Sequence, residues 1–194
     1  MDMTMSIEEH KERNARTKKM MLWFAMISMF MMFAGLTSAY VVSASRPDWL
    51  NELVLPMAFK ISTAVIVVSS VTFHLAKLAV KKNSRSAATT WLLVTLALGV
   101  AFVYLQFEGF RQFTEMGYFL TGSGSNPTTS FIYIVTVVHV AHLLAGLIVL
   151  LVVIYNHFKQ KYNPAQTLGI ELGAMFWHFL DVLWVYLFLF FYFY

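Results

Sequence analysis

The sequence predicts an all-α membrane protein built as one bundle of five transmembrane helices. Hydrophobic residues make up 59% of the chain and charged residues only 12%, whereas a soluble domain carries about 25% charged residues. Five apolar runs are each long enough to cross a bilayer, which takes about 20 residues. Segments this long and this apolar satisfy their backbone hydrogen bonds as helices rather than as barrel strands.

These helices leave little sequence for a soluble domain. Residues 1–19 are predicted to be a polar tail that can continue the first helix as an amphipathic extension, and residues 20–194 a single transmembrane domain. No internal repeat of the kind found in many transporters is visible. The predicted spans are Met20–Val42, Pro56–Val80, Ala87–Phe110, Phe131–Tyr155 and Leu168–Tyr192.

The basic residues predict the orientation of the bundle, because cytoplasmic loops carry an excess of Lys and Arg. Eleven of the fourteen flank one side of the predicted membrane region, and only Arg46, Lys60 and Arg111 fall on the other. The N-terminus is therefore predicted to be cytoplasmic and the C-terminus to lie outside. Since the net charge of +4 is spread along membrane flanks, it gives no reason to expect nucleic acid as a partner.

The chain contains no cysteine, which excludes disulfides, iron–sulfur clusters and thiolate copper centres within it. Methionine sulfur can bind copper(I), and the first predicted helix is rich in methionine. These methionines point in many directions around the helix, so we interpret them as adaptable packing residues. They are Met20, Met21, Met26, Met29, Met31 and Met32.

Four ionisable residues fall inside the last two predicted helices, where they are costly and mark a site or a helix contact. His139 and His142 are spaced i and i+3, and so are His178 and Asp181, so each pair shares one helix face. At about 1.5 Å per residue, all four lie roughly 12–20 Å deep in the hydrocarbon core. Because consecutive helices are usually neighbours, the two pairs are predicted to form a polar cluster near the midplane.

Such a cluster is compatible with several roles. Imidazole and carboxylate groups can ligate a metal, one histidine from each helix can ligate a haem, and a chain of such groups can relay protons. Interhelical hydrogen bonds, worth on the order of 1 kcal/mol each, are the commoner use in membranes. We therefore predict a structural role, with no catalytic, cofactor-binding or metal-binding residue in this chain.

Other polar residues in the predicted spans favour packing. Small hydroxyl residues crowd the second helix and permit close approach and bonding between helices. Glu108 and Arg111, at i and i+3, are predicted to pair at the membrane surface. Gly35 and Ala39 form a small-residue patch suited to a close helix crossing. The hydroxyl residues are Ser62, Thr63, Ser69, Ser70 and Thr72.

Three motifs in order along the chain resemble subunit III of the haem–copper oxidases, the terminal oxidases of respiration. The last helix carries Trp177-His178-Phe179-Leu180-Asp181-Val182-Leu183-Trp184, which is similar to the family pattern W-H-F-V-D-x-x-W. The preceding helix carries His139-x-x-His142-x-x-x-Gly146, and the first carries Phe33-Ala34-Gly35-Leu36 followed by Ala39-Tyr40. Ser69-Ser70 on the second helix and Phe102-x-x-x-Gln106 on the third are weaker similarities to the family. The resemblance covers about residues 18–194.

The resemblance implies the five-helix form of this subunit, which corresponds to the last five of seven helices in longer members. It implies a subunit that holds no haem or copper, which are expected in partner subunits. It also implies packing against subunit I, contact with subunit II and other oxidase subunits, respiratory supercomplexes as further partners, and bound structural phospholipid. The motif residues expected to pack helices are Trp177, Trp184, Gly35, Gly146 and Gln106.

The sequence departs from the family pattern at two places. Many relatives carry a glutamate directly after a serine of the first helix, but here Met29 follows Ser28. A role of that carboxylate in lipid binding or proton handling is therefore not expected here. Many relatives also place Glu-Trp three residues after the glutamine of the third helix, where this chain has Gly109-Phe110.

The predicted function is that of a non-catalytic subunit III of a respiratory oxidase in the bacterial inner membrane. The complex would reduce oxygen to water and couple this to proton translocation. We favour a cytochrome c oxidase, because the external loop leading into Ser130-Phe131-Ile132-Tyr133 looks more like those relatives. The alternatives are subunit III of a quinol oxidase and a stand-alone membrane haem-binding or transport protein that uses the midplane histidines.

Overall fold

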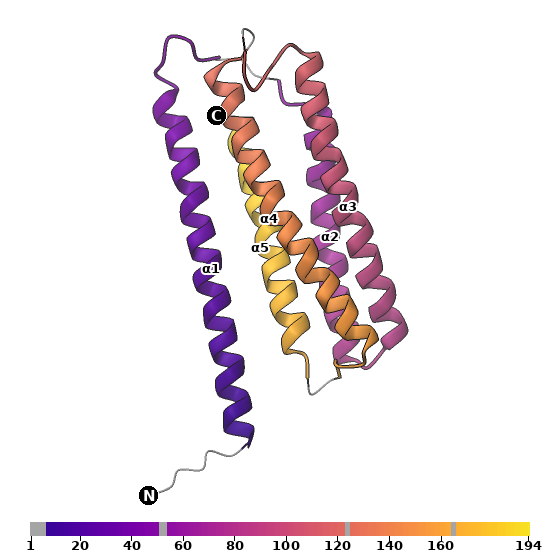
Figure 1. Ribbon diagram of the computed structural model, residues 1–194. Coiled ribbons are helices and arrows are strands. Elements are labelled where there is room, and N and C mark those ends of the chain that lie inside the picture. Colours follow the sequence, from indigo (N-terminus) through magenta and orange to yellow (C-terminus); the bar gives the residue numbers. More distant parts are fainter. Residues whose placement is uncertain (1–6, 51–53, 123–124, 164–165) are drawn as a thin grey trace, which may run out of the picture.

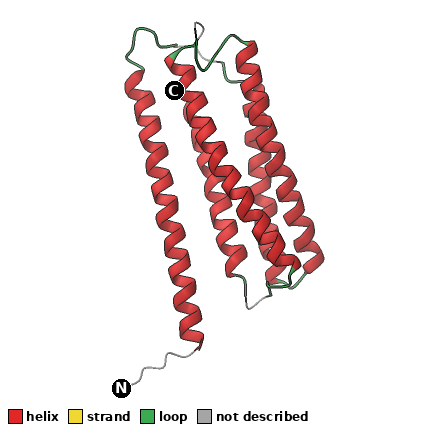
Figure 2. Cartoon of the chain, viewed as in Figure 1, coloured by secondary structure: helices red, strands yellow, loops and turns green. Residues whose placement is uncertain are grey.

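The computed structural model describes residues 7–50, 54–122, 125–163 and 166–194. Five helices account for most of them (Figure 1, Figure 2). Each is long and apolar enough to cross a membrane, which confirms the predicted fold class. The helices are α1 (Ile7–Ser43), α2 (Met57–Lys81), α3 (Arg85–Glu115), α4 (Pro127–Phe158) and α5 (Leu168–Phe193).

Most of the helices are longer than the apolar runs that predicted them. The α1 helix begins at Ile7, so residues 7–19 continue it, as expected. The α3 helix runs on to Glu115, and α4 begins at Pro127, where the Asn126 side chain accepts a hydrogen bond from the Thr128 amide at 2.9 Å. Hydrophobicity ends at the first charged residue, whereas the helical backbone continues into the headgroup region, where polar side chains are solvated.

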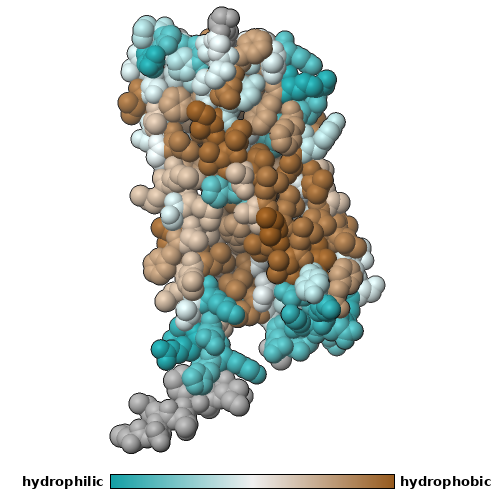
Figure 3. All heavy atoms as spheres, in the orientation of Figure 1, coloured by the Kyte–Doolittle hydropathy of each residue, from teal (hydrophilic) through white to brown (hydrophobic). Residues whose placement is uncertain are grey.

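Four helices form a ring, and α1 leans against one side of it. Helix α2 packs on α3 and α5, α4 packs on the same two helices, and α1 contacts α4 and α5 (Figure 1). On the face shown in Figure 3, apolar side chains cover most of the middle of the molecule, and polar residues gather at both ends. We call the end at which α1, α3 and α5 begin the basic end, because Lys11–Lys19, Lys81–Arg85, Lys159 and Lys161 lie there.

The outer face of α1 is not covered by the rest of the described chain. Trp23, Phe24 and Met31 are more than half exposed. A Cβ atom added to Gly35 would meet no atom within 4 Å, so the crossing predicted for Gly35 and Ala39 is absent from the packing among the described residues. These small residues point outward, and the sequence pattern alone did not distinguish this from an internal contact.

The connection between α1 and α2 is tied to the start of α4. Trp49 lies against Tyr40, with ring centroids 4.7 Å apart, and the Leu50 amide donates to the Thr128 hydroxyl at 3.0 Å. Arg46 and Asp48 form an ion pair at 2.9 Å, and the guanidinium hydrogen bond holds the pKa of Asp48 below its usual value. These contacts close the end of the bundle opposite the basic end.

Candidate functional site

Two tryptophans of the α5 motif bond to hydroxyls of α2. Trp177, 1% exposed, donates from its indole Nε1 to Ser69 Oγ at 3.1 Å. Two turns further on, Trp184 donates to Thr63 Oγ1 at 3.0 Å. The two bonds fix both the distance and the register of α5 against α2, because each indole has one donor and each needs a buried acceptor.

Glycines on the other two helices of the ring make room for the Trp177 side chain. A Cβ added to Gly99 of α3 would lie 2.8 Å from the end of the Trp177 ring. A Cβ added to Gly146 of α4 would lie 2.7 Å from Leu180 Cδ1, and the Trp177 ring is the next group beyond it. Trp177 therefore sits where α2, α3, α4 and α5 meet.

Each of the five hydroxyl residues singled out on the second helix bonds across to another helix. This confirms the prediction that they serve helix packing. The Gln106 amide donates to Ser62 Oγ at 2.9 Å, and the Thr72 and Thr95 hydroxyls lie 2.8 Å apart, so α2 is bonded to α3. The partners on α5 are Trp184 for Thr63, Trp177 for Ser69 and His178 for Ser70.

The Thr72–Thr95 bond offers a measurement of this packing. We expect a double-mutant cycle with Thr72→Val and Thr95→Val to give a coupling free energy of about 0.6 kcal/mol, the average of such cycles in one helical membrane protein. The measurement is the free energy of unfolding of each variant in detergent. Thr72 and the distant, exposed Thr114 should show additive effects, and equal coupling in both cycles would contradict the assigned bond.

The two histidines of α4 face aromatic side chains. His139 is fully buried, and its ring centroid lies 5.1 Å from that of Trp184 and 6.1 Å from that of Phe102. Neither of its ring nitrogens has a hydrogen-bond partner among the described residues. His142 donates from Nδ1 to the carbonyl of Val138 at 2.7 Å and has its ring 5.7 Å from that of Phe33 on α1.

The polar pair of α5 faces α2 instead. His178 Nδ1 lies 2.6 Å from Ser70 Oγ, and the His178 ring centroid is 6.3 Å from that of His74. Asp181 is only 3% exposed, and neither of its carboxyl oxygens has a hydrogen-bond partner in the described part of the chain. The contacts of this pair thus lead to α2, whereas those of the α4 pair lead to Phe33, Phe102 and Trp184.

The structure therefore gives the two pairs different surroundings rather than one shared cluster. The sequence predicted how deep these four residues lie in the membrane. It did not predict the direction in which each side chain points around its helix axis, and this direction decides which residues meet. Trp177 and Trp184 fix one face of α5 on α2, which brings their neighbours His178 and Asp181 to the same helix. Within the described ranges, no group of three or more His, Cys, Asp or Glu residues could hold a metal ion.

An ion-pair cluster at the basic end joins three helices, and the sequence reasoning missed it. Glu171 of α5 lies 3.3 Å from Lys19 of α1 and 3.3 Å from Lys81 of α2, and it accepts from the Thr167 hydroxyl at 2.9 Å. A single acid in the first turn of α5, among basic flanks, was the signal that could have revealed it. At the other end Arg111 pairs with Glu108 at 2.6 Å, as predicted.

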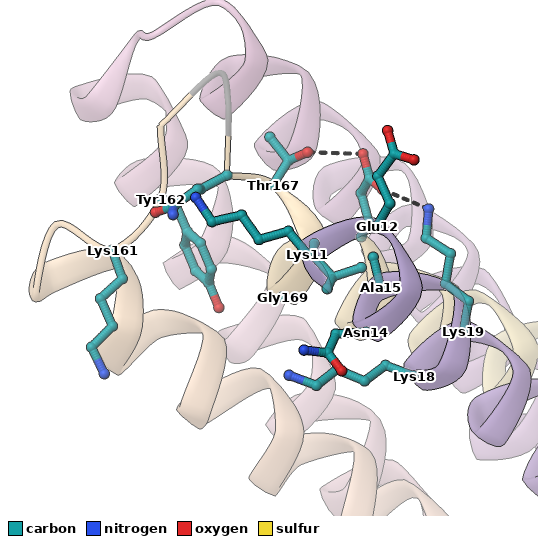
Figure 4. Close-up of a pocket in the computed structure, with 13 residues that line it drawn as sticks. Lys11, Glu12, Asn14, Ala15, Lys18, Lys19, Lys161, Tyr162, Thr167 and Gly169 are labelled. Carbon is teal, nitrogen blue, oxygen red and sulfur yellow. Dashed lines mark hydrogen bonds and ion pairs between the residues drawn. The ribbon is translucent and has the colours of Figure 1, made fainter. Parts of the chain in front are cut away.

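A cleft runs between α1 and the α4–α5 pair. At the basic end it is a polar cavity of about 600 Å³ that lies between Lys11 and Lys18 of α1 and the loop residues Lys161 and Tyr162 (Figure 4). Deeper in the membrane it adjoins an apolar groove of about 460 Å³, since Tyr162 and Gly169 line both. The walls of this groove include Leu22, Ala25, Met29, Val152, Val153 and Phe176.

Comparison with known proteins identifies the family. The family model for cytochrome c oxidase subunit III matches residues 4–194. The chain belongs to this family. Probable cytochrome c oxidase subunit 3 of Nocardia farcinica is 31% identical over 172 residues, which cover 86% of this chain and 82% of that protein.

Further relatives include subunits of cytochrome c oxidases and of a ubiquinol oxidase, which are named for different electron donors. Cytochrome c oxidase subunit 3 of Corynebacterium diphtheriae is 32% identical over 166 residues, covering 82% of this chain and 79% of that protein. Cytochrome bo(3) ubiquinol oxidase subunit 3 of Pseudomonas aeruginosa is 28% identical over 167 residues, covering 84% and 78%. Because these relatives are subunits of oxidase complexes, the partners of this chain are other oxidase subunits.

The structure shows what surrounds the residue at which the first helix departs from the family pattern. Met29, which stands where many relatives carry a glutamate, lines the apolar groove between α1 and the α4–α5 pair. This part of the groove is therefore lined by hydrocarbon and thioether groups. A carboxylate at Met29 would need a polar partner, because an unpaired charge is costly at this depth.

Proposed function

We propose that this subunit III is non-catalytic and stabilises a cytochrome c oxidase of the bacterial inner membrane by packing against subunit I. One observation carries the proposal: three polar groups of the α5 motif bond to α2, through Trp177 to Ser69, His178 to Ser70 and Trp184 to Thr63. Groups engaged in this way hold helices together. The oxygen chemistry and its coupling to proton translocation then belong to the haem and copper centres of partner subunits.

The experiment that tests this role is purification of the tagged chain from its own membranes. A large subunit with the redox haems should co-purify, together with subunit II, and any larger assembly with other respiratory complexes would appear in the same preparation. The chain separated from its partners should lack a haem absorption band. A stoichiometric haem band in the free chain would contradict the proposal and support a stand-alone haem protein.

The electron donor is proposed to be cytochrome c. The two cytochrome c oxidase relatives described above share more than 30% identity with this chain, whereas the ubiquinol oxidase relative shares 28%. Oxygen consumption by the purified complex should be faster with reduced cytochrome c than with a quinol. Faster oxidation of quinol, with no two-copper centre in subunit II, would instead favour the quinol oxidase assignment.

The orientation we propose places the basic end of the bundle in the cytoplasm, with the N-terminus inside and the C-terminus outside. It rests on the excess of Lys and Arg at that end. Single-cysteine variants in this cysteine-free chain test it directly. In intact cells, a membrane-impermeant thiol reagent should label a cysteine placed at the exposed Ser45 and leave one placed at the exposed Lys82 unlabelled.

We further propose that the cleft between α1 and the α4–α5 pair holds a structural phospholipid. The lysines at its mouth suit a phosphate group, and the adjoining apolar groove suits an acyl chain. Replacing Lys11, Lys18 and Lys161 together by glutamine is expected to reduce co-purified anionic phospholipid severalfold, as measured by lipid analysis of the complex. The same change at Lys60 and Lys82, outside the cleft, serves as control, and an equal loss there would refute the placement.

A further inference from the structure

His74 of α2 is an exposed histidine inside the membrane-spanning region. It lies seven residues before Lys81, the last residue of α2, and therefore about 10 Å from that end of the helix. Among the described residues of the five predicted spans, no other His, Lys, Arg, Asp or Glu side chain is exposed this deep. Ionisable residues at such depth almost always face protein or a water-filled cavity. The exposed position of His74 therefore indicates a surface that another protein covers.

The neighbours of His74 along the seam between α2 and α5 are also polar and partly open to the outside. Ser70 lies one turn away on α2, and its Oγ is 2.6 Å from His178 Nδ1. The ring centroid of His178 is 6.3 Å from that of His74, and both Ser70 and His178 are only partly buried. The described residues give the His74 ring no hydrogen-bond partner, although an imidazole always has at least one N–H group to donate.

Polar residues recur along one stripe of α2 at alternating spacings of three and four. This spacing keeps them on one face of the helix, and it is the spacing that packs against a second helix at a small crossing angle. The outer face of α1 is different, because Trp23, Phe24 and Met31 make it apolar and suited to acyl chains. The members of the α2 stripe are Lys60, Thr63, Val67, Ser70, His74 and Lys77.

An apolar groove continues the same surface toward the end opposite the basic end. Its volume is about 660 Å³, and its walls include Ala64, Val67 and Val68 of α2 and Phe188 and Tyr192 of α5. Short and β-branched side chains on the α2 wall leave room for the side chains of an approaching helix. The surface thus combines an apolar part with a few hydrogen-bonding groups, as protein interfaces do.

The charge of the α2 stripe indicates the chemistry of what covers it. The stripe carries Lys60, His74 and Lys77, and the described residues supply no ion-pair partner for them, whereas nearby Lys81 is paired with Glu171. Lipid phosphate groups are within reach of the two lysines, whose long side chains extend toward the headgroups. They are not within reach of the short His74 side chain about 10 Å from the helix end. A carboxylate on a protein helix at that level would be complementary.

We propose that the seam between α2 and α5 receives a transmembrane helix of another oxidase subunit, with a carboxylate opposite His74 and Lys77. The proposal rests on the proposed role of the chain as a packing subunit and specifies the surface through which it packs. The arriving helix would fill the groove, remove His74 from contact with lipid and supply the missing partner for its ring. We call this surface the docking face, which consists of the α2 stripe and of Phe188 and Tyr192.

Photo-crosslinking of the chain in the complex with which it purifies tests the docking face. A photoreactive amino acid is placed at Val71, which is 55% exposed and lies three residues before His74. Illumination is expected to link the chain to another oxidase subunit, which mass spectrometry of the larger product identifies. The same amino acid at Phe24, 67% exposed on the outer face of α1, is the matched control and should react with lipid.

His74→Leu provides a second readout that does not depend on the bulky probe. Leucine suits lipid, so the unfolding free energy of the separated full chain should not fall. The fraction of purified oxidase that retains this chain in detergent should nevertheless fall about three- to tenfold, as expected for the loss of one interhelical hydrogen bond. Tyr104→Leu, at an exposed position of α3, should leave this fraction unchanged.

Three results would overturn the docking face in an oxidase that still contains this chain. They are a link from Val71 to lipid alone or to a second copy of the chain, retention of His74→Leu equal to that of wild type, and a destabilised His74→Leu chain, which would place the role of His74 within the chain. Failure of the proposed function looks different, because the wild-type chain would then co-purify with no oxidase subunit at all.

Discussion

Trp177→Ala is expected to destabilise the bundle by about 3–5 kcal/mol, the range found when a buried large aromatic side chain is removed. The side chain is 1% exposed and occupies the point where four helices meet. Its loss leaves a cavity between Gly99 and Gly146 and removes the indole donor from Ser69. The measurement is the free energy of unfolding in detergent, followed by tryptophan fluorescence or circular dichroism.

Two further variants separate packing from hydrogen bonding at this position. Ser69→Ala leaves the whole Trp177 ring in place and removes only the hydroxyl that accepts its N–H group, so it should cost on the order of 1 kcal/mol. Trp23→Ala removes the same side chain from the outer face of α1, where it is 54% exposed, and should change the unfolding free energy little. If Trp23→Ala and Trp177→Ala have equal effects, the central position assigned to Trp177 is wrong.

Gly99→Ala is expected to have the next largest effect, about 1–3 kcal/mol, through overpacking. The added methyl group would lie 2.8 Å from the Trp177 ring and 3.0 Å from Leu147 Cδ2. The ring cannot easily withdraw, because its Nε1 is bonded to Ser69 and its other side faces Gly146. The intrinsic preference of alanine for helices, worth up to about 1 kcal/mol, offsets part of this cost.

Gly35→Ala is the matched control, since an added methyl group there meets nothing within 4 Å among the described residues. Its unfolding free energy should equal that of the wild-type chain or exceed it slightly. Thermal unfolding of the purified full chain in one detergent compares the two variants directly. A loss at Gly35 as large as that at Gly99 would mean that the substitution acts on the helix backbone rather than on the contact with Trp177.

The number and order of the helices were predictable because a bilayer imposes a length and an apolar composition on each span. Residues 7–19 were expected to continue the first helix, but the end of α3 was not predicted, because the mostly polar segment Arg111–Glu115 lies beyond the apolar run and is still helical. Hydroxyls on α2 were predictable as packing groups, because small polar residues have few other uses inside a membrane. Their partners on α5 were not, since a bond depends on the direction of both side chains.

For the ionisable residues of α4 and α5, the depth in the membrane was predictable from the sequence, but the direction of each side chain was not. Counting residues placed His139, His142, His178 and Asp181 at similar depth, but the structure turns the first two toward aromatic side chains and the last two toward α2. Gly35 illustrates a second reason why a helix contact could not be predicted from the sequence. A small-residue patch has the same sequence pattern whether it faces another helix of the chain or the surroundings.

The measurement that tests the central claim most directly is a comparison of the purified oxidase with and without this chain. The claim is that the chain stabilises a complex whose redox centres lie elsewhere. Removal of the chain should leave the haem spectrum and the initial rate of oxygen reduction close to those of the intact complex, while activity is lost sooner during sustained turnover. Loss of a haem band, or of all oxygen reduction from the first turnover, would contradict the claim.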